Sequence, residues 1–276
     1  MRECPPSGSG WMHMIMDGLI ESRRKYPSPN PHVRLEEITY WSDGLKVKGL
    51  LAEPVANGKY EGIIYLRGGM QHIGMVRPSR IAQFASNGFV VFAPYYRGNR
   101  GGEGRDEFAG DDRLDAVNAI EVLKQSKKIL PDRIHLFAFS RGGIMALWTA
   151  IFRDDITSIV TWAGVSDIVL TYKERKDMRR MMKRVIGGTP TSKPDEYRER
   201  TALLRINEID APVLIIHGML DENVSIEQAK LLENALRENN KVHETWYFPQ
   251  YTHFIPPAKN AQIVRDLCDW VRRQGK

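Results

Sequence analysis

The apolar positions along this chain show two different patterns, one typical of buried strands and one typical of amphipathic helices. Short, mostly apolar runs such as Gly62–Leu66 and Pro212–His217 are typical of strands that are buried on both faces. Longer segments such as Asp111–Ser126 carry apolar residues every three or four positions, which indicates amphipathic helices. The predicted strands are Leu35–Trp41, Leu45–Ala52, Gly62–Leu66, Phe89–Ala93, Ile134–Phe139, Ile156–Trp162, Pro212–His217 and His243–Phe248, and the predicted helices are Arg80–Asn87, Asp111–Ser126, Gly142–Ile151, Ile226–Asn239 and Asn260–Arg273.

Strands that alternate with helices predict an α/β fold, with a mainly parallel central sheet and helices on both faces. The first two strands flank a turn at 42–44 and should form an antiparallel hairpin at one edge. The segment at about 167–210 interrupts the alternation, and it is basic and rich in methionine. We expect this insertion to form a small helical lid over the carboxyl ends of the strands.

The N-terminal residues have a different character. Residues 1–34 are expected to be an extension of a catalytic domain at 35–276. Within the extension, Trp11–Lys25 has apolar residues at helical spacing and is followed by Pro27 and Pro29, which predicts a short helix. This helix could pack on the main domain or form a contact in a homodimer.

Charge and cysteine content narrow the class of protein. The net charge of +6 could favour nucleic acid, but much of the excess lies in Lys173–Arg184, where a solvated helix face is the simpler interpretation. Cys4 and Cys268 suggest neither a zinc site nor a disulfide framework. No apolar stretch is long enough to span a bilayer. We therefore expect a cytoplasmic protein with no membrane or nucleic-acid partner.

Ser140 lies where a predicted strand meets a predicted helix. Nucleophilic serines occupy such a sharp turn in the pattern G-x-S-x-G, because only small neighbours let the strand and the helix approach. Here Ala138 replaces the first glycine, while Gly142 and Gly143 follow the serine. An ordinary serine at the start of a helix is the alternative interpretation.

Asp221 and His253 each follow a later predicted strand. The order Ser, Asp, His is the order of α/β-hydrolase triads, and the three loops should converge at the carboxyl edge of the sheet. A serine hydroxyl needs a base to become nucleophilic, and a carboxylate orients the imidazole that serves as this base. We therefore predict Ser140 as nucleophile, His253 as general base and Asp221 as the orienting acid.

Acyl transfer also needs donors for the oxyanion. We predict the backbone N–H of Arg141 as one donor and that of Gly69 as the other, since Gly68 and Gly69 let the backbone approach closely. Among the other histidines, His217 and His135 are expected to be structural, and His72 could face the site. No residue cluster indicates a metal, and the glycine-rich stretch at 97–104 does not fit a nucleotide site, so no cofactor is expected.

From about Leu35 onwards the chain resembles the catalytic domain of the prolyl oligopeptidase family, in the α/β-hydrolase superfamily. The matching stretches are Tyr40–Gly49, Arg67–Gly69, Tyr96–Gly104, Phe139–Gly143, Ile216–Gly218 with Asp221 and Val224, and the loop around His253. The resemblance implies a serine hydrolase that cleaves ester or amide bonds of small substrates through an acyl-enzyme.

The sequence departs from the family pattern in ways that leave the substrate open. Residues 1–31 are too short for the β-propeller of the family's peptidases, so carboxylesterase and aminoacyl- or oligopeptidase activity stay equally open. Relatives often have histidine or tyrosine at the position of Arg67, and this arginine, with Gly68, could bind substrate or support its loop. The cationic side chains suggest an acidic group on the substrate: Arg67, Arg77, Arg97, Arg100 and those of the basic lid. A catalytically silent hydrolase-fold protein that binds a small molecule or a partner is the alternative function.

Overall fold

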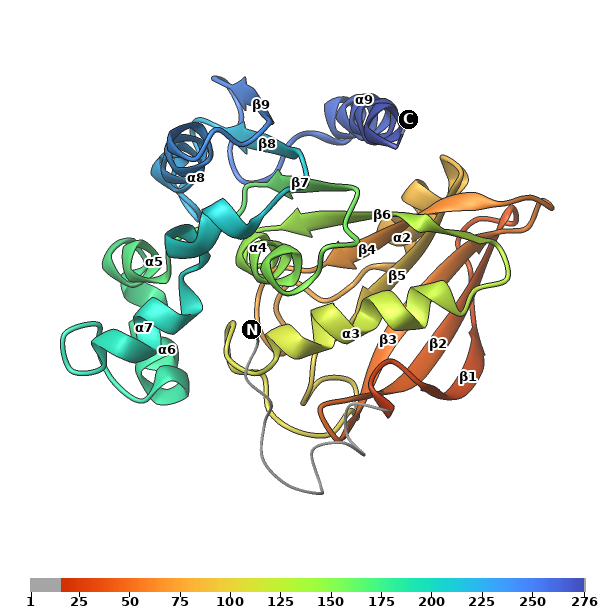
Figure 1. The fold of residues 1–276 in the computed structure, drawn as a ribbon, viewed down its shortest axis with the longest axis horizontal. Helices are drawn as coiled ribbons and strands as arrows, with labels where there is room; N and C mark the ends of the chain where they lie inside the picture. The colour runs from red at the N-terminus through yellow and green to blue at the C-terminus, as the bar shows by residue number, and fades with distance from the viewer. Residues whose placement is uncertain (1–15, 276) are drawn as a thin grey trace.

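The computed structural model describes residues 16–275, in which nine strands form one sheet (Figure 1). Their order across the sheet is β1-β2-β3-β5-β4-β6-β7-β8-β9. The strands are β1 (Ile20–Tyr26), β2 (Val33–Ser42), β3 (Leu45–Pro54), β4 (Tyr60–Leu66), β5 (Phe89–Pro94), β6 (Ile129–Phe139), β7 (Ser158–Trp162), β8 (Val213–Gly218) and β9 (His243–Phe248).

The sheet has an antiparallel part and a parallel part. The pairs from β1 through β2 and β3 to β5 are antiparallel, whereas the pairs from β5 through β4, β6, β7 and β8 to β9 are all parallel. The parallel strands therefore place their carboxyl ends, and the loops that follow them, along one edge of the sheet. This is the edge at which open α/β sheets carry their ligands.

Helices cover both faces of the sheet and divide the core into two halves (Figure 1). The long helices are α2 (Pro78–Ser86), α3 (Arg113–Lys124), α4 (Gly142–Phe152), α8 (Ile226–Glu238) and α9 (Pro257–Gln274). α2 and α9 bury Phe84 and Trp270 in one half of the core. α3, α4 and α8 bury Leu123, Leu147 and Leu236 in the other half. This two-sided packing explains why the central strands are almost continuously apolar, and the mainly parallel α/β arrangement predicted from the pattern is confirmed.

The insertion between β7 and β8 is helical. It consists of α5 (Ile168–Glu174), η1 (Lys176–Met178), α6 (Arg179–Ile186), α7 (Pro194–Arg200) and η2 (Ala202–Glu208). On α6, Met182 and Ile186 are buried while Lys183 and Arg184 are exposed. The basic run is thus the outer face of an amphipathic helix.

The helix predicted at Trp11–Lys25 is wrong for its C-terminal part. Ile20–Tyr26 forms the edge strand β1, which pairs with Leu35–Tyr40 of β2 and therefore joins the sheet of the main domain. Cross-strand ion pairs strengthen the pairing, with Arg24 at 2.8 Å from Glu37. Residues 16–19 form a turn before this strand, and residues 11–15 of the prediction, with most of the segment considered as a homodimer contact, lie outside the described residues. No helix within residues 16–275 is long and apolar enough to cross a membrane.

Candidate functional site

Ser140 lies in the sharp turn between β6 and α4. Its φ is +56°, a left-handed conformation that costs an ordinary residue on the order of 1–3 kcal/mol. Three backbone hydrogen bonds hold the turn: the Ser140 N–H donates to the carbonyl of Trp162 at 3.1 Å, and the Ser140 carbonyl accepts from Gly143 and Val165 at 2.9 Å each. The strand–turn–helix geometry expected around this serine is therefore present.

The glycines around Ser140 are required by close backbone contacts. A Cβ on Gly142 would lie 2.2 Å from the Leu66 carbonyl oxygen, and one on Gly143 would lie 2.8 Å from the Cα of Gly164. A Cβ on Gly68, in the loop after β4, would lie 2.6 Å from the Cβ of Ser140. The loop after β4 therefore packs directly against the serine.

Asp221 and His253 are hydrogen-bonded to each other. Asp221 Oδ2 lies 2.7 Å from His253 Nδ1, and both residues are buried. The other carboxylate oxygen, Oδ1, accepts from the backbone N–H groups of Asn223 at 2.8 Å and Val224 at 2.9 Å. With Nδ1 donating to the carboxylate, Nε2 of the imidazole carries the free lone pair that a general base needs.

Close backbone packing joins the loops that carry the acid and the imidazole. Leu220 N–H donates to the Tyr251 carbonyl at 2.9 Å. A Cβ on Gly218 would lie 2.4 Å from that carbonyl oxygen, so only glycine lets the two loops meet. The His253 ring contacts Phe139, at 4.8 Å between ring centres, and Phe254, at 5.0 Å, and these two phenyl rings also contact each other. Because Phe139 immediately precedes Ser140, these contacts place the imidazole beside the strand end that carries the serine.

His217 and His135 have structural partners, as the sequence predicted. His217 Nε2 lies 2.8 Å from the Val224 carbonyl oxygen and 3.6 Å from Asp221 Oδ2. Burial lowers the pKa of His217, so its ring is neutral and donates from Nε2. It braces the loop that holds Asp221. His135 lies within β6, with its Nδ1 2.8 Å from Ser158 Oγ.

The predicted oxyanion donors lie on the two segments that meet at Ser140. Gly69 has a φ of +64°, and a Cβ there would lie 2.2 Å from the Ile73 carbonyl oxygen. Arg141 directly follows the serine and begins α4 in a right-handed helical conformation. Both residue types and positions fit a site that presents backbone N–H groups.

Arg67 supports the loop that carries Gly68 and Gly69. Its buried guanidinium donates to the carbonyl oxygens of Gly68 at 3.1 Å, Ile73 at 3.2 Å and Tyr95 at 3.0 Å. It also lies 3.4 Å from Asp106. Of the two roles left open by the sequence, substrate binding and loop support, these contacts favour loop support. Burial and the neighbouring Arg141 lower the pKa of Arg67 to about 10, so it stays charged at neutral pH.

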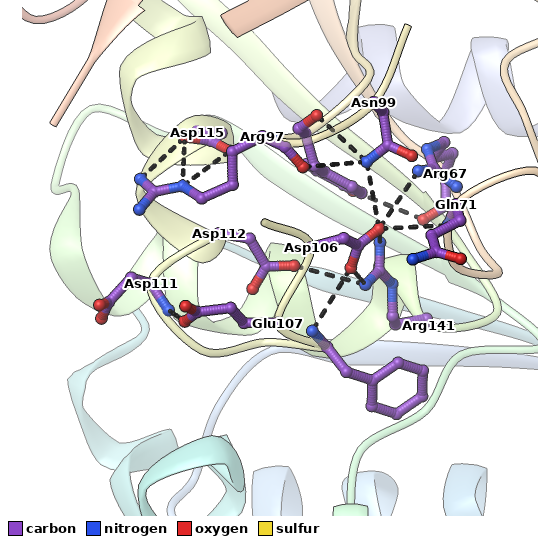
Figure 2. Close-up of polar contacts among 12 residues, drawn as sticks. Arg67, Gln71, Arg97, Asn99, Asp106, Glu107, Asp111, Asp112, Asp115 and Arg141 are labelled. Carbon is purple, nitrogen blue, oxygen red and sulfur yellow. Dashed lines mark hydrogen bonds and ion pairs between the residues drawn. The ribbon is translucent and has the colours of Figure 1, made fainter. Parts of the chain in front are cut away.

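A buried ionic cluster lies beneath this loop (Figure 2). The Arg141 guanidinium bonds to both oxygens of Asp106 and lies 3.3 Å from Asp112 Oδ2. Its carbon also lies 5.0 Å from the centre of the Tyr96 ring. Burial opposes the charge of Asp106, but Arg141 and Arg67 outweigh burial and lower the pKa of Asp106. The residue that follows the serine is therefore fixed at both its backbone and its side chain.

Asp112 is the less satisfied carboxylate of the cluster. Within residues 16–275, its Oδ1 has no hydrogen-bond partner, and neither has Arg141 Nε. Burial raises the pKa of Asp112 to about 7, and the attraction of Arg141 only partly offsets it. Asp112 therefore titrates within the physiological range.

Arg97 forms a separate pair, also drawn in Figure 2, with Asp115. Its Nη2 lies 3.0 Å from Asp115 Oδ1, and Asp43 lies 3.2 Å from its Nη1. This arginine is fully engaged by carboxylates of the protein.

A cavity of about 500 Å³ opens beside the loop after β4. One wall is part of that loop and includes Arg67 and His72, and the other is the loop after β5 and includes Tyr95 and Arg100. His72 lines this cavity, and whether it faces the triad stays a prediction. Among residues 16–275, no group of three or more His, Cys, Asp or Glu side chains could hold a metal ion.

The ionic cluster and the aromatic contacts of His253 were not predicted. Arg141 offered a signal, because a charged residue within an otherwise buried apolar segment must find partners. Its partners could not be identified, since Asp106 is 35 residues away along the chain. Phe139 directly precedes Ser140, and Phe254 directly follows His253. Nothing in the sequence pattern indicated that both phenyl rings contact the imidazole of His253.

Comparison with known proteins places these observations in context. The model of the prolyl oligopeptidase family matches residues 75–276. The uncharacterized peptidase YtmA of Bacillus subtilis is 56% identical over 257 residues, which cover 93% of this chain and 100% of that protein.

Solved structures share the fold at low sequence identity. An acylaminoacyl peptidase of Pyrococcus horikoshii superposes with a TM-score of 0.75 at 18% identity, over 99% of this chain and 44% of that one. Acetyl xylan esterase 1 from Thermoanaerobacterium sp. JW/SL YS485 superposes with a TM-score of 0.73 at 14% identity, over 94% of this chain and 91% of that one. Together with the sheet order, these similarities confirm the α/β-hydrolase fold.

Proposed function

Because this chain belongs to the prolyl oligopeptidase family and is a serine hydrolase of that family, we propose that Ser140, His253 and Asp221 form its catalytic triad. The observation that carries the proposal is the 2.7 Å hydrogen bond between Asp221 and His253, at the sheet edge where Ser140 occupies a left-handed turn. Ser140 Oγ has no hydrogen bond to another described residue. In unliganded enzymes this last link is often long, and it tightens when substrate binds.

The reaction proceeds in two balanced steps. Ser140 Oγ attacks the carbonyl carbon of the substrate while its proton passes to His253 Nε2, and the same proton then protonates the leaving alkoxide or amine. Water next attacks the acyl-enzyme, again losing its proton to His253, and the acid product leaves with Ser140 restored. Asp221 stabilises the imidazolium that forms in each step.

The N–H groups of Arg141 and Gly69 stabilise the oxyanion in both steps. Support comes from the rigid placement of the two residues. The Arg141 side chain is held by Asp106, and the Gly69 loop is held by Arg67. Donors that are fixed before the reaction need no reorganisation when charge develops on the substrate oxygen.

The substrates we propose are esters or amides of small molecules, including aminoacyl and short-peptide amides. Exposed apolar residues occur on the loops after β4, β8 and β9 and offer a surface for an uncharged substituent: Ile73, Met219, Leu220 and Phe254. We propose that the helical insertion covers this edge as a lid. In support, Arg175 at the end of α5 donates to the Asn223 carbonyl at 3.0 Å, two residues beyond Asp221.

The test is a hydrolysis screen of wild type and Ser140→Ala in parallel. p-Nitrophenyl acyl esters are compared with aminoacyl and short-peptide chromogenic amides, and a fluorophosphonate probe reports the nucleophile. We expect turnover and labelling in wild type and neither in the variant. Ester turnover alone would identify a carboxylesterase, and amide turnover would identify a peptidase. Equal activity in the variant would exclude Ser140 as nucleophile.

Two further expectations belong to this proposal. A cytoplasmic location is supported by Cys268, a buried free thiol. Homodimer formation rests only on the methionine-rich N-terminal segment, and sedimentation of the full chain tests it.

A further inference from the structure

The cavity of about 500 Å³ shares a wall with the catalytic loop. Arg67 lines the cavity, and its Nη1 donates to the carbonyl oxygen of Gly68, the residue that packs on Ser140. The loop that packs on Ser140 therefore also forms one wall of the cavity. The volume lies within the range of small-molecule sites, which is about 300–1,000 Å³.

Two of the arginines that the sequence analysis associated with an acidic substrate are already paired with carboxylates of the protein. Arg97 is bound to Asp115 and Asp43. The guanidinium of Arg67 is buried among carbonyl oxygens and Asp106. Neither is free to bind a ligand anion.

Arg100 is the arginine of this set that stays available in the cavity. It is exposed, it lines the cavity, and within residues 16–275 no carboxylate pairs with it. The Arg100 guanidinium makes a cation–π contact with the Tyr95 ring, whose centre lies 5.7 Å from the guanidinium carbon. Tyr95 also lines the cavity, so this contact holds the cation against the cavity wall.

The backbone and the charge balance both favour an anion there. Arg100 has a φ of +53° between Gly98 and Gly101, which have φ values of +74° and +77°. Such a tight turn fixes the base of the side chain, and strain of this kind concentrates at functional sites. No Asp or Glu belongs to the residues that line the cavity, and the carboxylate that contacts its lining residues, Asp106, is paired with Arg67 and Arg141, so the charge of Arg100 is not compensated there by a lining carboxylate.

We infer that this cavity is an anion subsite, and that the preferred ester or amide substrate carries a carboxylate that Arg100 binds. The inference rests on the proposed function, because it names the substrate class of the same site. A guanidinium binds a carboxylate through two parallel hydrogen bonds, which gives both affinity and orientation.

The test compares matched substrates that differ by one negative charge. The 4-nitrophenyl half-ester of adipic acid is paired with its methyl ester, which places the charge on the acyl side. 4-Acetoxybenzoate is paired with 4-acetoxybenzamide, which places the charge on the leaving group. Each pair is assayed with wild type, Arg100→Gln and Arg105→Gln. Arg105 is an exposed arginine of the same loop that does not line the cavity.

In wild type we expect kcat/KM for the anionic member of at least one pair to exceed that of its neutral partner by about tenfold or more, and to fall as salt is added. Arg100→Gln should remove this preference while leaving the neutral substrate within about twofold of wild type, and Arg105→Gln should change neither. The carboxylate product should also inhibit wild type more strongly than Arg100→Gln.

Three outcomes would overturn the inference while the proposed function stands. They are Ser140-dependent hydrolysis with no preference for the anionic member of either pair, an equal loss on both members in Arg100→Gln, and an equal loss of the preference in Arg105→Gln. Hydrolysis that persists in Ser140→Ala, or is absent for every substrate, would instead refute the proposed function.

Discussion

Replacing Gly68 by alanine tests how closely the loop after β4 is fitted to the nucleophile. The new Cβ would lie 2.6 Å from the Cβ of Ser140 and 3.2 Å from its Oγ. It would also lie 3.0 Å from the carbonyl oxygen of Phe139, which is backbone and cannot rotate away. The conflict therefore falls on the reacting residue itself.

The size of the effect follows from these distances. Carbon atoms that are not bonded prefer about 3.5–4.0 Å, so the loop or the serine must move by about 1 Å. A misplacement of that size costs on the order of 100-fold in rate, or about 2.7 kcal/mol in the activation free energy. Overpacking should lower the free energy of unfolding by about 1–3 kcal/mol, too little by itself to explain the loss of rate.

The assay measures kcat/KM on a p-nitrophenyl ester, the rate of fluorophosphonate labelling, and urea unfolding. Gly88→Ala is the control, because Gly88 has a φ of +83°, a Cβ there would lie 3.6 Å from the Arg272 guanidinium, and it precedes β5 at the amino end of the parallel strands, opposite the edge that carries the triad. This control should lose about 1 kcal/mol of stability and keep its activity. If Gly68→Ala keeps kcat/KM and labelling within about twofold of wild type, the fit inferred here is wrong.

Three further substitutions test the triad, the ionic cluster and the buried thiol of α9. Since burial raises the pKa of Asp112 to about 7, against about 3.9 when unfolded, the native state binds a proton more tightly and wild-type stability falls as pH rises between those values. Asp112→Asn lacks this titration. As pH rises between about 3.9 and 7, its free energy of unfolding minus that of wild type should therefore increase by up to about 1.4 kcal/mol per pH unit, measured by urea unfolding. A difference that does not change with pH would contradict the raised pKa of Asp112. Asp221→Asn should lower kcat by on the order of 10⁴-fold by favouring the wrong imidazole tautomer, and a loss below about tenfold would exclude its orienting role. Burial raises the pKa of Cys268 to about 12, so a Cys4→Ser chain should react with a disulfide reagent only after unfolding, and rapid labelling of the native protein would show otherwise.

Much of the fold could be predicted because its central strands are buried on both faces. Such strands appear as short apolar runs, and β9 was predicted at its observed bounds, His243–Phe248. The alternation of these runs with amphipathic helices left few topologies. The positions of Asp221 and His253 after their strands then predicted that the two side chains would meet, and their 2.7 Å contact follows from that topology.

β1 could not be predicted because its stability is not local. Only its end residues, Ile20 and Tyr26, are partly buried, and the five residues between them are exposed. The strand is held by its ladder to β2 and by ion pairs such as Arg23 with Glu36. A helical pattern of apolar residues upstream therefore extended the prediction too far.

The roles of the arginines were equally hidden in the sequence. The sequence does not distinguish Arg67, Arg97 and Arg100. In the structure Arg67 and Arg97 are buried and Arg100 is exposed. Which of them is neutralised depends on carboxylates supplied by other loops. Only the structure shows that Arg97 and Arg67 are paired with carboxylates of the protein, while Arg100 is exposed and has no carboxylate partner among residues 16–275.

The order of strands in the sheet also sets the order in which the site can form during synthesis. β6 and β7 build the turn of Ser140, and β8 and β9 are then added outward, one after the other. A nascent chain that has emerged as far as Val165 already contains every residue that holds this turn, and proteins fold progressively from the N-terminus as they leave the ribosome. It lacks both Asp221 and His253. Hydrolysis by the proposed triad therefore begins only after the residues beyond 253 have emerged, so incomplete chains carry an inert serine.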